Sequence, residues 1–218
     1  MVSIGLMSVV LSFLLSAGVS LFIGRALILG SPGKGTGVSG SVLLAYALLL
    51  FWQPDRVWLS NASVVMVGGC LGFLLSRLLS SSASVIAFLL TATVVDLLSF
   101  SGGFTNEILQ AYRSGESELL RFLVVLVNSE GGTRAVIGVG DLVILTASYV
   151  GFQRATGSEV EPAVWLLGGL SAALVLGLLV GGLPGIPFVA AGALFFVARR
   201  RWFPPAGPQS RSFARSDH

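Results

Sequence analysis

The stretches SASVIAFLLTATVVDLLSF at 82–100 and AVIGVGDLVILTASYVGF at 135–152 each contain a single charged residue, Asp96 in the first and Asp141 in the second. Each is close to the roughly 20 apolar residues that a helix needs to cross a bilayer. An ionisable side chain inside such a span costs at least ~2.5 kcal/mol on insertion scales, so it indicates a functional role. Two such carboxylates on separate spans suggest a pair that works together.

The composition of the chain is that of an integral membrane protein. Of its 218 residues, 54% are hydrophobic and 11% are charged, whereas a soluble domain carries about 25% charged residues. The single cysteine, Cys70, excludes an internal disulfide and a cysteine-based zinc cluster. The net charge of +3 is small and scattered along the chain, which argues against a nucleic-acid partner.

Seven apolar stretches predict an all-α polytopic membrane protein with about seven transmembrane helices. Three of them fall in an N-terminal region, 1–82, and four in a region at 83–199 that contains both acids; the polar tail at 200–218 is expected to be disordered. Clusters of helix breakers, such as SPGKGTG at 31–37, separate the stretches. The expected spans are 3–24, 38–53, 62–79, 83–100, 135–152, 163–181 and 183–199.

The segment 101–134 is more polar than the rest and contains only one short apolar run, LLRFLVVLV at 119–127. About ten residues cannot cross a bilayer as a helix. We expect this segment to lie at the membrane interface or to cover the site, and a surface amphipathic helix fits the pattern equally well.

The distribution of basic residues predicts the orientation in the membrane. With seven spans, nine Lys and Arg residues fall on one side and four on the other, and Arg199–Arg201 directly follow the last span. Because basic residues favour the cytoplasmic side, we expect the N-terminus outside and the C-terminus in the cytoplasm, in what we take to be a prokaryotic cell membrane.

The two acids are expected to lie at similar depth on antiparallel neighbouring helices. Asp96 lies about four residues before the end of its predicted span and Asp141 about six after the start of the next, which is roughly 6–9 Å from the same face at 1.5 Å per residue. Two carboxylates in contact share one proton, so the ionised one can take a proton from an attacking water while the other stabilises a carbonyl oxygen. This chemistry needs no metal and no cofactor.

Glycines precede the second acid in the pattern Gly138-Val139-Gly140-Asp141. Two glycines separated by one residue leave a bare strip of backbone, which lets a neighbouring helix or an extended substrate come close. We predict that a β-branched residue at Gly140 abolishes activity without unfolding the protein. The four-residue pattern is weak alone and gains weight from the second acid within a span.

The last span opens with Leu183-Pro184-Gly185-Ile186-Pro187. Two prolines three residues apart prevent a regular helix there, and irregular backbone at membrane depth is tolerated where it borders protein or a water-filled cavity. The alternative is an ordinary helix start with proline in its first turn.

Taken in order, VVDLLSF around Asp96, GVGD at 138–141 and LPGIP at 183–187 resemble the YD, GxGD and PAL signatures of the presenilin and signal-peptide-peptidase family. Val95 stands where the family usually has Tyr, and Gly185-Ile186 replaces Ala-Leu. The resemblance implies a presenilin-like helical bundle that cleaves transmembrane segments of substrate proteins.

By the same resemblance, Asp96 and Asp141 would be catalytic, and Pro184, Gly185 and Ile186 would position an unwound substrate. The stretch before Asp141 would pair with that substrate as a strand. The expected orientation is similar to that of signal peptide peptidases.

Other chemistries are less consistent with the residues. An intramembrane serine protease needs a histidine, and the one histidine is the terminal His218; the HExxH motif of a zinc protease is absent. A prepilin peptidase also uses GxGD, but it commonly has a lysine two residues after the acid, where this chain has Val143. A proton-coupled transporter or channel, in which the two acids relay protons, is the alternative from another class.

Overall fold

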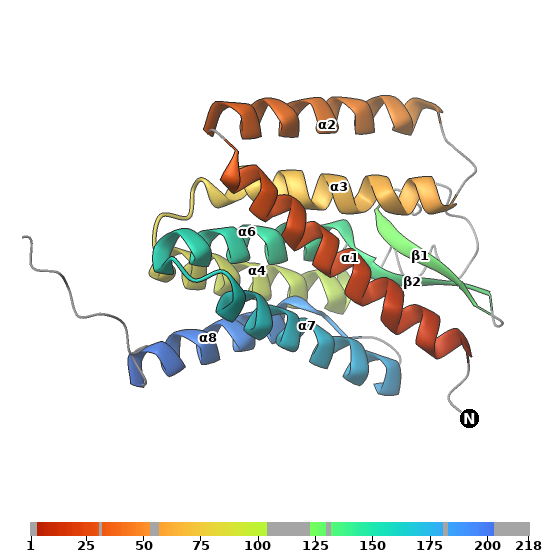
Figure 1. Ribbon diagram of the computed structural model, residues 1–218. Helices are drawn as coiled ribbons and strands as arrows, with labels where there is room; N and C mark the ends of the chain where they lie inside the picture. Colours follow the sequence, from red (N-terminus) through yellow and green to blue (C-terminus); the bar gives the residue numbers. More distant parts are fainter. Residues whose placement is uncertain are drawn as a thin grey trace, which may run out of the picture.

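The computed structural model describes residues 4–30, 32–52, 57–103, 123–129, 132–180 and 183–202. This part of the chain is mostly helical, as predicted, and contains one small β-hairpin (Figure 1). The helices and strands in chain order are α1 (Ile4–Leu29), α2 (Pro32–Trp52), α3 (Val57–Ser76), α4 (Ser82–Gly102), β1 (Val124–Ser129), β2 (Gly132–Gly138), α6 (Val139–Thr156), α7 (Val160–Val180) and α8 (Ile186–Trp202). Each helix overlaps one of the seven apolar stretches.

Four helices in the described part of the chain are long and apolar enough to cross a membrane. They contain the segments Met7–Leu29, Val57–Ser76, Ser82–Ser101 and Val160–Val180. The apolar side chains of α4 support this reading, because Leu90, Val94, Leu97 and Leu98 are exposed. A contiguous apolar surface of this kind is unusual on a soluble protein.

Several predicted boundaries are wrong. Helix α2 begins at Pro32, inside the segment 31–37 that we expected to separate two helices. Proline is tolerated at the first helical position because its missing N–H would have no acceptor there. Helix α6 begins at Val139 instead of 135 and continues to Thr156, where Gly157 in the left-handed conformation (φ 68°) ends it.

The residues before α6 form a strand instead of the predicted helical turn. Strands β1 and β2 pair antiparallel, from Val124 opposite Gly138 to Ser129 opposite Gly132. The run 119–127 therefore contributes to β1, and the amphipathic-helix alternative is wrong for its last four residues. The remainder of the predicted extramembrane segment, 104–122 and 130–131, lies outside the described residues, as does the tail from 203.

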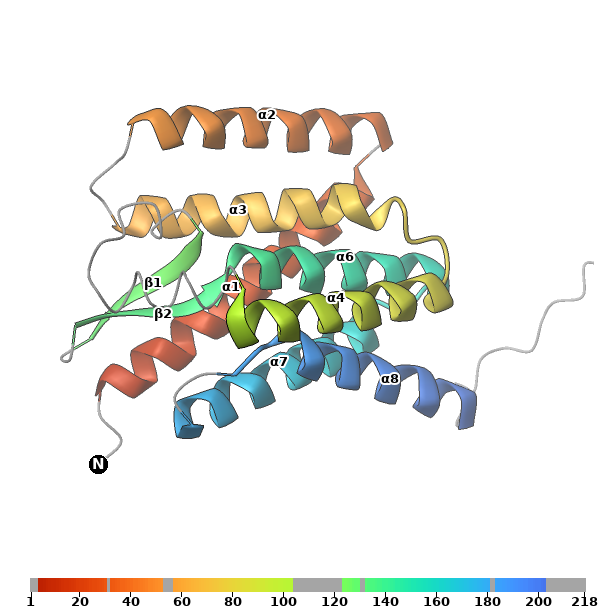
Figure 2. The same ribbon diagram turned by 180° about the vertical axis from the view of Figure 1, so that it is seen from behind.

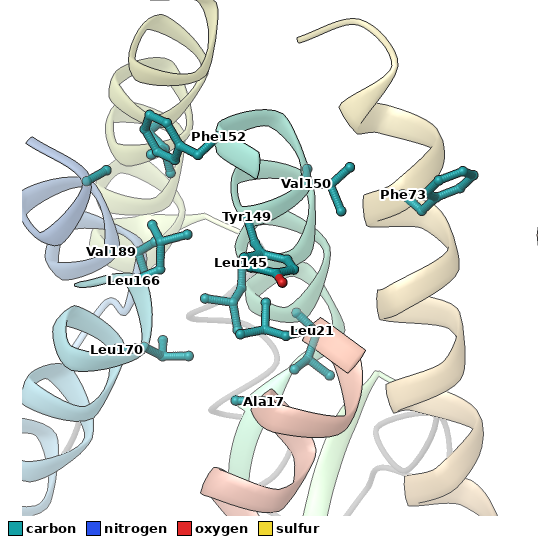
Figure 3. Packing of buried hydrophobic residues seen from close by; sticks show 14 of the residues in the cluster. Ala17, Leu21, Phe73, Leu145, Tyr149, Val150, Phe152, Leu166, Leu170 and Val189 are labelled. Carbon is teal, nitrogen blue, oxygen red and sulfur yellow. The ribbon is translucent and has the colours of Figure 1, made fainter. Parts of the chain in front are cut away.

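Helix α6 lies at the centre of the bundle and is buried from Leu145 to Gln153. Figure 3 shows Leu145 and Tyr149 of α6 among apolar side chains of the surrounding helices. Helix α3 approaches α6 closely at two glycines: a Cβ added at Gly68 would lie 2.6 Å from the Leu142 Cβ, and one added at Gly72 would lie 2.7 Å from the Thr146 Cβ. Small residues spaced in this way allow tight helix packing within a membrane.

Different helices begin and finish at the two ends of the bundle (Figures 1 and 2). At one end α4 finishes, α6 and α8 begin, and the hairpin lies beside α1 and α3. At the other end α1, α3, α6 and α8 finish and α7 begins. Both predicted acids belong to the first end.

Candidate active site

Asp141 lies in the first turn of α6, as its third residue. Its Oδ2 accepts a hydrogen bond from the backbone N–H of Gly138 at 3.1 Å, which is the contribution that the third helical residue makes to a capping box. A carboxylate in this position also interacts favourably with the helix dipole. The start of α6 therefore holds the Asp141 side chain in place.

The hairpin determines where α6 begins. Strand β2 ends at Gly138, and the next residue, Val139, donates its N–H to the Leu123 carbonyl at 2.8 Å. The side chains of Val125 and Ile137 are buried and anchor the two strands. Asp141 is therefore positioned by the hairpin that precedes it in the chain and by the helix that contains it.

Asp96 lies on α4, six residues before the helix ends at Gly102. Its neighbours Val95 and Leu97 are exposed, whereas Asp96 itself is partly buried. The Asp96 Oδ2 accepts a hydrogen bond at 3.2 Å from the backbone N–H of Ile186. Because Ile186 is the first residue of α8, this N–H has no acceptor within its own helix. Asp96 thus caps a helix 90 residues away in the sequence.

The two carboxylates lie close to the Gly185-Ile186 segment. Asp96 accepts the Ile186 N–H, and a Cβ added at Gly185 would lie 3.3 Å from the Asp141 Oδ1. The carboxylates of Asp96 and Asp141 also interact electrostatically with each other. The structure therefore brings together both predicted acids and the middle of the LPGIP motif.

The predicted distances of the two acids from the ends of their helices are wrong in detail. Asp96 lies six residues from the end of α4, and Asp141 only two after the first residue of α6. At 1.5 Å per residue these are roughly 9 Å and 3 Å. The two helix ends differ in level, because α6 begins only after β2 has taken up residues 132–138 as strand.

Both predictions for LPGIP are partly right. Leu183, Pro184 and Gly185 are irregular, and α8 begins at Ile186 with Pro187 in its first turn. The Gly185 carbonyl accepts hydrogen bonds from the N–H groups of two α8 residues, Phe188 at 3.2 Å and Val189 at 3.3 Å. Leu183 is exposed, Pro184 and Pro187 are partly buried, and Ile186 is buried.

The glycines before Asp141 have different surroundings. A Cβ added at Gly138 would lie 3.3 Å from the Asp141 Oδ2, whereas one added at Gly140 would meet no atom of the described residues within 4 Å. Gly140 is exposed, and Val139 is partly buried. Gly140 therefore does not serve the packing of a neighbouring helix in this chain, so that part of the prediction is wrong. The space beside it is open to another molecule.

Two features of the site were missed from the sequence. Leu170 of α7 is buried, and its Cδ1 would lie 3.4 Å from a Cβ at Gly185, so α7 forms part of the wall. No pattern distinguishes this leucine from others in an apolar helix. The hairpin, in contrast, had a recognisable signal: two runs rich in β-branched residues flank Glu130-Gly131-Gly132.

Within the described residues, no group of three or more His, Cys, Asp or Glu side chains could hold a metal ion. Comparison with known proteins found no matching family model, no matching curated protein and no matching solved structure. The function is therefore argued from the chemistry of the site.

Proposed function

We propose that this protein is an intramembrane aspartyl protease that hydrolyses peptide bonds within transmembrane segments, with Asp96 and Asp141 as its catalytic pair. The observation that carries the proposal is that the Asp96 carboxylate accepts the Ile186 N–H while the Asp141 carboxylate lies beside Gly185, where an added Cβ would be 3.3 Å from its Oδ1. These acids come from helices separated by a long segment of chain, and each is held by a backbone N–H at a helix start. We further propose that the chain is a relative of the presenilin and signal-peptide-peptidase family.

In the proposed reaction, the two carboxylates hold one proton between them, because like charges at close range cannot both ionise cheaply. The ionised carboxylate takes a proton from water as the water oxygen bonds to the peptide carbonyl carbon. The protonated carboxyl group donates a hydrogen bond to the carbonyl oxygen, where negative charge develops. When the C–N bond breaks, a proton passes to the leaving amine, and the pair returns to one shared proton.

The substrate would have to be unwound, because in a helix the carbonyl and the N–H of a peptide bond are occupied by hydrogen bonds to other residues of that helix. Two features of the site support an extended substrate. Open space adjoins Gly140, next to Asp141 in the chain, and strand β2 ends three residues before Asp141. A sheet edge can add an extended peptide through backbone hydrogen bonds. We propose that β2 and the LPGIP segment lie on either side of the scissile bond.

For the membrane arrangement, we propose that all seven helices cross, with the N-terminus outside and the C-terminus in the cytoplasm. The support is the separation of charge along the bundle. Six arginines of the described residues lie at the end away from the aspartates: Arg25, Arg77, Arg154, Arg199, Arg200 and Arg201. Basic residues gather on the cytoplasmic side of membrane proteins, which puts the aspartates toward the outer side.

The test is cleavage of a single-span substrate by the purified protein in liposomes, with product ends located by mass spectrometry. We expect cleavage inside the span that is lost in Asp96→Asn and in Asp141→Asn. Asp217→Asn, the same change in the tail, is the control and should retain activity. Cleavage that persists in Asp141→Asn would overturn the proposal. Proton flux in the same liposomes, without cleavage, would support the transporter or channel instead.

A further inference from the structure

The arginine-rich end of the bundle contains more positive charge than its own acids neutralise. In the described residues it carries six arginines and two glutamates, Glu159 and Glu161. Arg25 pairs with the Glu159 Oε2 at 2.5 Å. Arg199 and Arg200 bind the two oxygens of Glu161 at 2.7 and 3.1 Å.

These ion pairs occupy the glutamates. The remaining Glu159 oxygen, Oε1, accepts a hydrogen bond from Gln153 at 3.4 Å, and both oxygens of Glu161 are already engaged by arginine. Each glutamate oxygen at this end therefore already has a partner among the described residues, and that partner is neither Arg77 nor Arg154.

Two further arginines, Arg77 and Arg154, form a pair at the end of α3, and no acidic side chain of the described residues compensates their charge. Arg77 donates to the Thr36 Oγ1 at 2.6 Å. Arg154 donates to both the carbonyl and the hydroxyl of Ser76, each at 3.3 Å, and its guanidinium lies 5.6 Å from the centre of the Phe73 ring. Ser76 is the residue before Arg77, and the two guanidinium groups repel each other. Among the described residues, neither arginine has an acidic partner.

We propose that Arg77 and Arg154 together bind the phosphate of an anionic phospholipid. A phosphate between two guanidinium groups would relieve their repulsion, and the planar N–H donors of arginine match phosphate oxygens. Neutral hydroxyl and carbonyl acceptors orient both side chains in advance, so little side-chain freedom is lost on binding. The site is separate from the aspartates, and it depends on the membrane location but not on proteolysis.

Apolar surface on α3 and directly after Arg77 favours a lipid over free phosphate. Leu78, directly after Arg77, is 76% exposed, and Leu71 on α3 is 37% exposed. Helix α3 is also one of the four helices able to cross a membrane. A ligand with both a phosphate and acyl chains would bind the arginines and cover these leucines at the same time. Arg residues at a membrane surface attract anionic lipids in this way.

The test is native mass spectrometry of the full chain released from nanodiscs of phosphatidylcholine that contain a minor fraction of phosphatidylglycerol. We expect the wild type to retain phosphatidylglycerol selectively. Arg77→Gln and Arg154→Gln should each lower the retained phosphatidylglycerol roughly tenfold, because each removes a charge-assisted bond to phosphate. The matched control is Arg201→Gln, which removes one exposed positive charge from the same end and should retain the lipid.

Three results would overturn the proposal. The wild type could show no preference for phosphatidylglycerol, or all three variants could lose it equally, which would indicate general surface charge. Inorganic phosphate could raise the melting temperature in pure phosphatidylcholine as much as phosphatidylglycerol does, which would identify free phosphate as the ligand. If Arg154→Gln fails to fold because Ser76 loses its donor, Arg77→Gln decides the question alone.

Discussion

The aspartate end and the arginine end of the bundle handle charge in opposite ways. At the aspartate end, a backbone N–H of the described residues holds each carboxylate, and both carboxylates lie close to the Gly185-Ile186 segment. At the arginine end, three of the arginines form ion pairs with the two glutamates near the start of α7. These three arginines have acidic partners, whereas the two aspartates lie close together and have no basic partner among the described residues. Such an arrangement is costly in a membrane, which is why we attribute the chemistry to it.

The largest expected effect is on the aspartates themselves. Asp96→Asn or Asp141→Asn should each lower the cleavage rate by at least ~10²-fold, because a positioned acid or base contributes about 10²–10⁴-fold. An Asn retains an oxygen to accept the Gly138 or Ile186 N–H, so folding should be preserved. Initial rates and thermal melting of the same preparations measure the two quantities. A large fall in melting temperature would show that the acids serve structure instead.

Gly140→Val tests the open space beside Asp141. A Cβ at this position meets no atom of the described residues within 4 Å, so we expect an unchanged melting temperature. Activity should fall to background, because the added methyl groups would fill the space that we assign to the substrate. Gly168→Val on α7, where a Cβ also meets no atom within 4 Å, is the control. Undiminished cleavage by Gly140→Val would remove the glycine from the substrate path.

Gly185→Ala tests how closely the two acids need to approach the LPGIP segment. The new methyl group would lie 3.3 Å from the Asp141 Oδ1, which must give by a few tenths of an ångström, and it would contact the Leu170 Cδ1 at 3.4 Å on its other side. We expect a roughly tenfold loss of cleavage rate, since misplacement of a reacting group by about 1 Å can cost up to 10²-fold. The double variant Gly185→Ala/Leu170→Ala leaves room on one side; if it recovers no activity, the crowding explanation fails.

Glu161→Gln should produce the smallest effect, at the other end of the bundle. It removes the charge that binds Arg199 and Arg200, and Arg199 is largely exposed. Exposed pairs contribute about 1 kcal/mol or less, so we expect a small fall in the free energy of unfolding and no change in cleavage rate. A marked loss of activity would show that the two ends are coupled, contrary to the separation described above.

The helical part of the fold was predictable because it follows from local chemistry. A run of apolar residues in a membrane must satisfy its own backbone hydrogen bonds, and a helix does so within the run. All seven apolar stretches therefore matched helices, although Pro32 began a helix where a separator was expected. The hairpin differs from the prediction because a strand needs a partner. Taken one at a time, the two runs predict loop and helix, whereas β1 and β2 are strands because they pair with each other.

The sequence by itself determined the apolar helices, the presence of two acids within them and the irregular segment around Pro184, because each depends on residues adjacent in the chain. Only the tertiary structure decided that Asp96 caps α8 by accepting its first free N–H and that Gly185 lies close to Asp141. It also decided that α6 starts at the end of a strand, which sets the level of Asp141. Contacts between residues as distant as Asp96 and Ile186 arise from the packing of α4 against α8, and no local pattern encodes that packing.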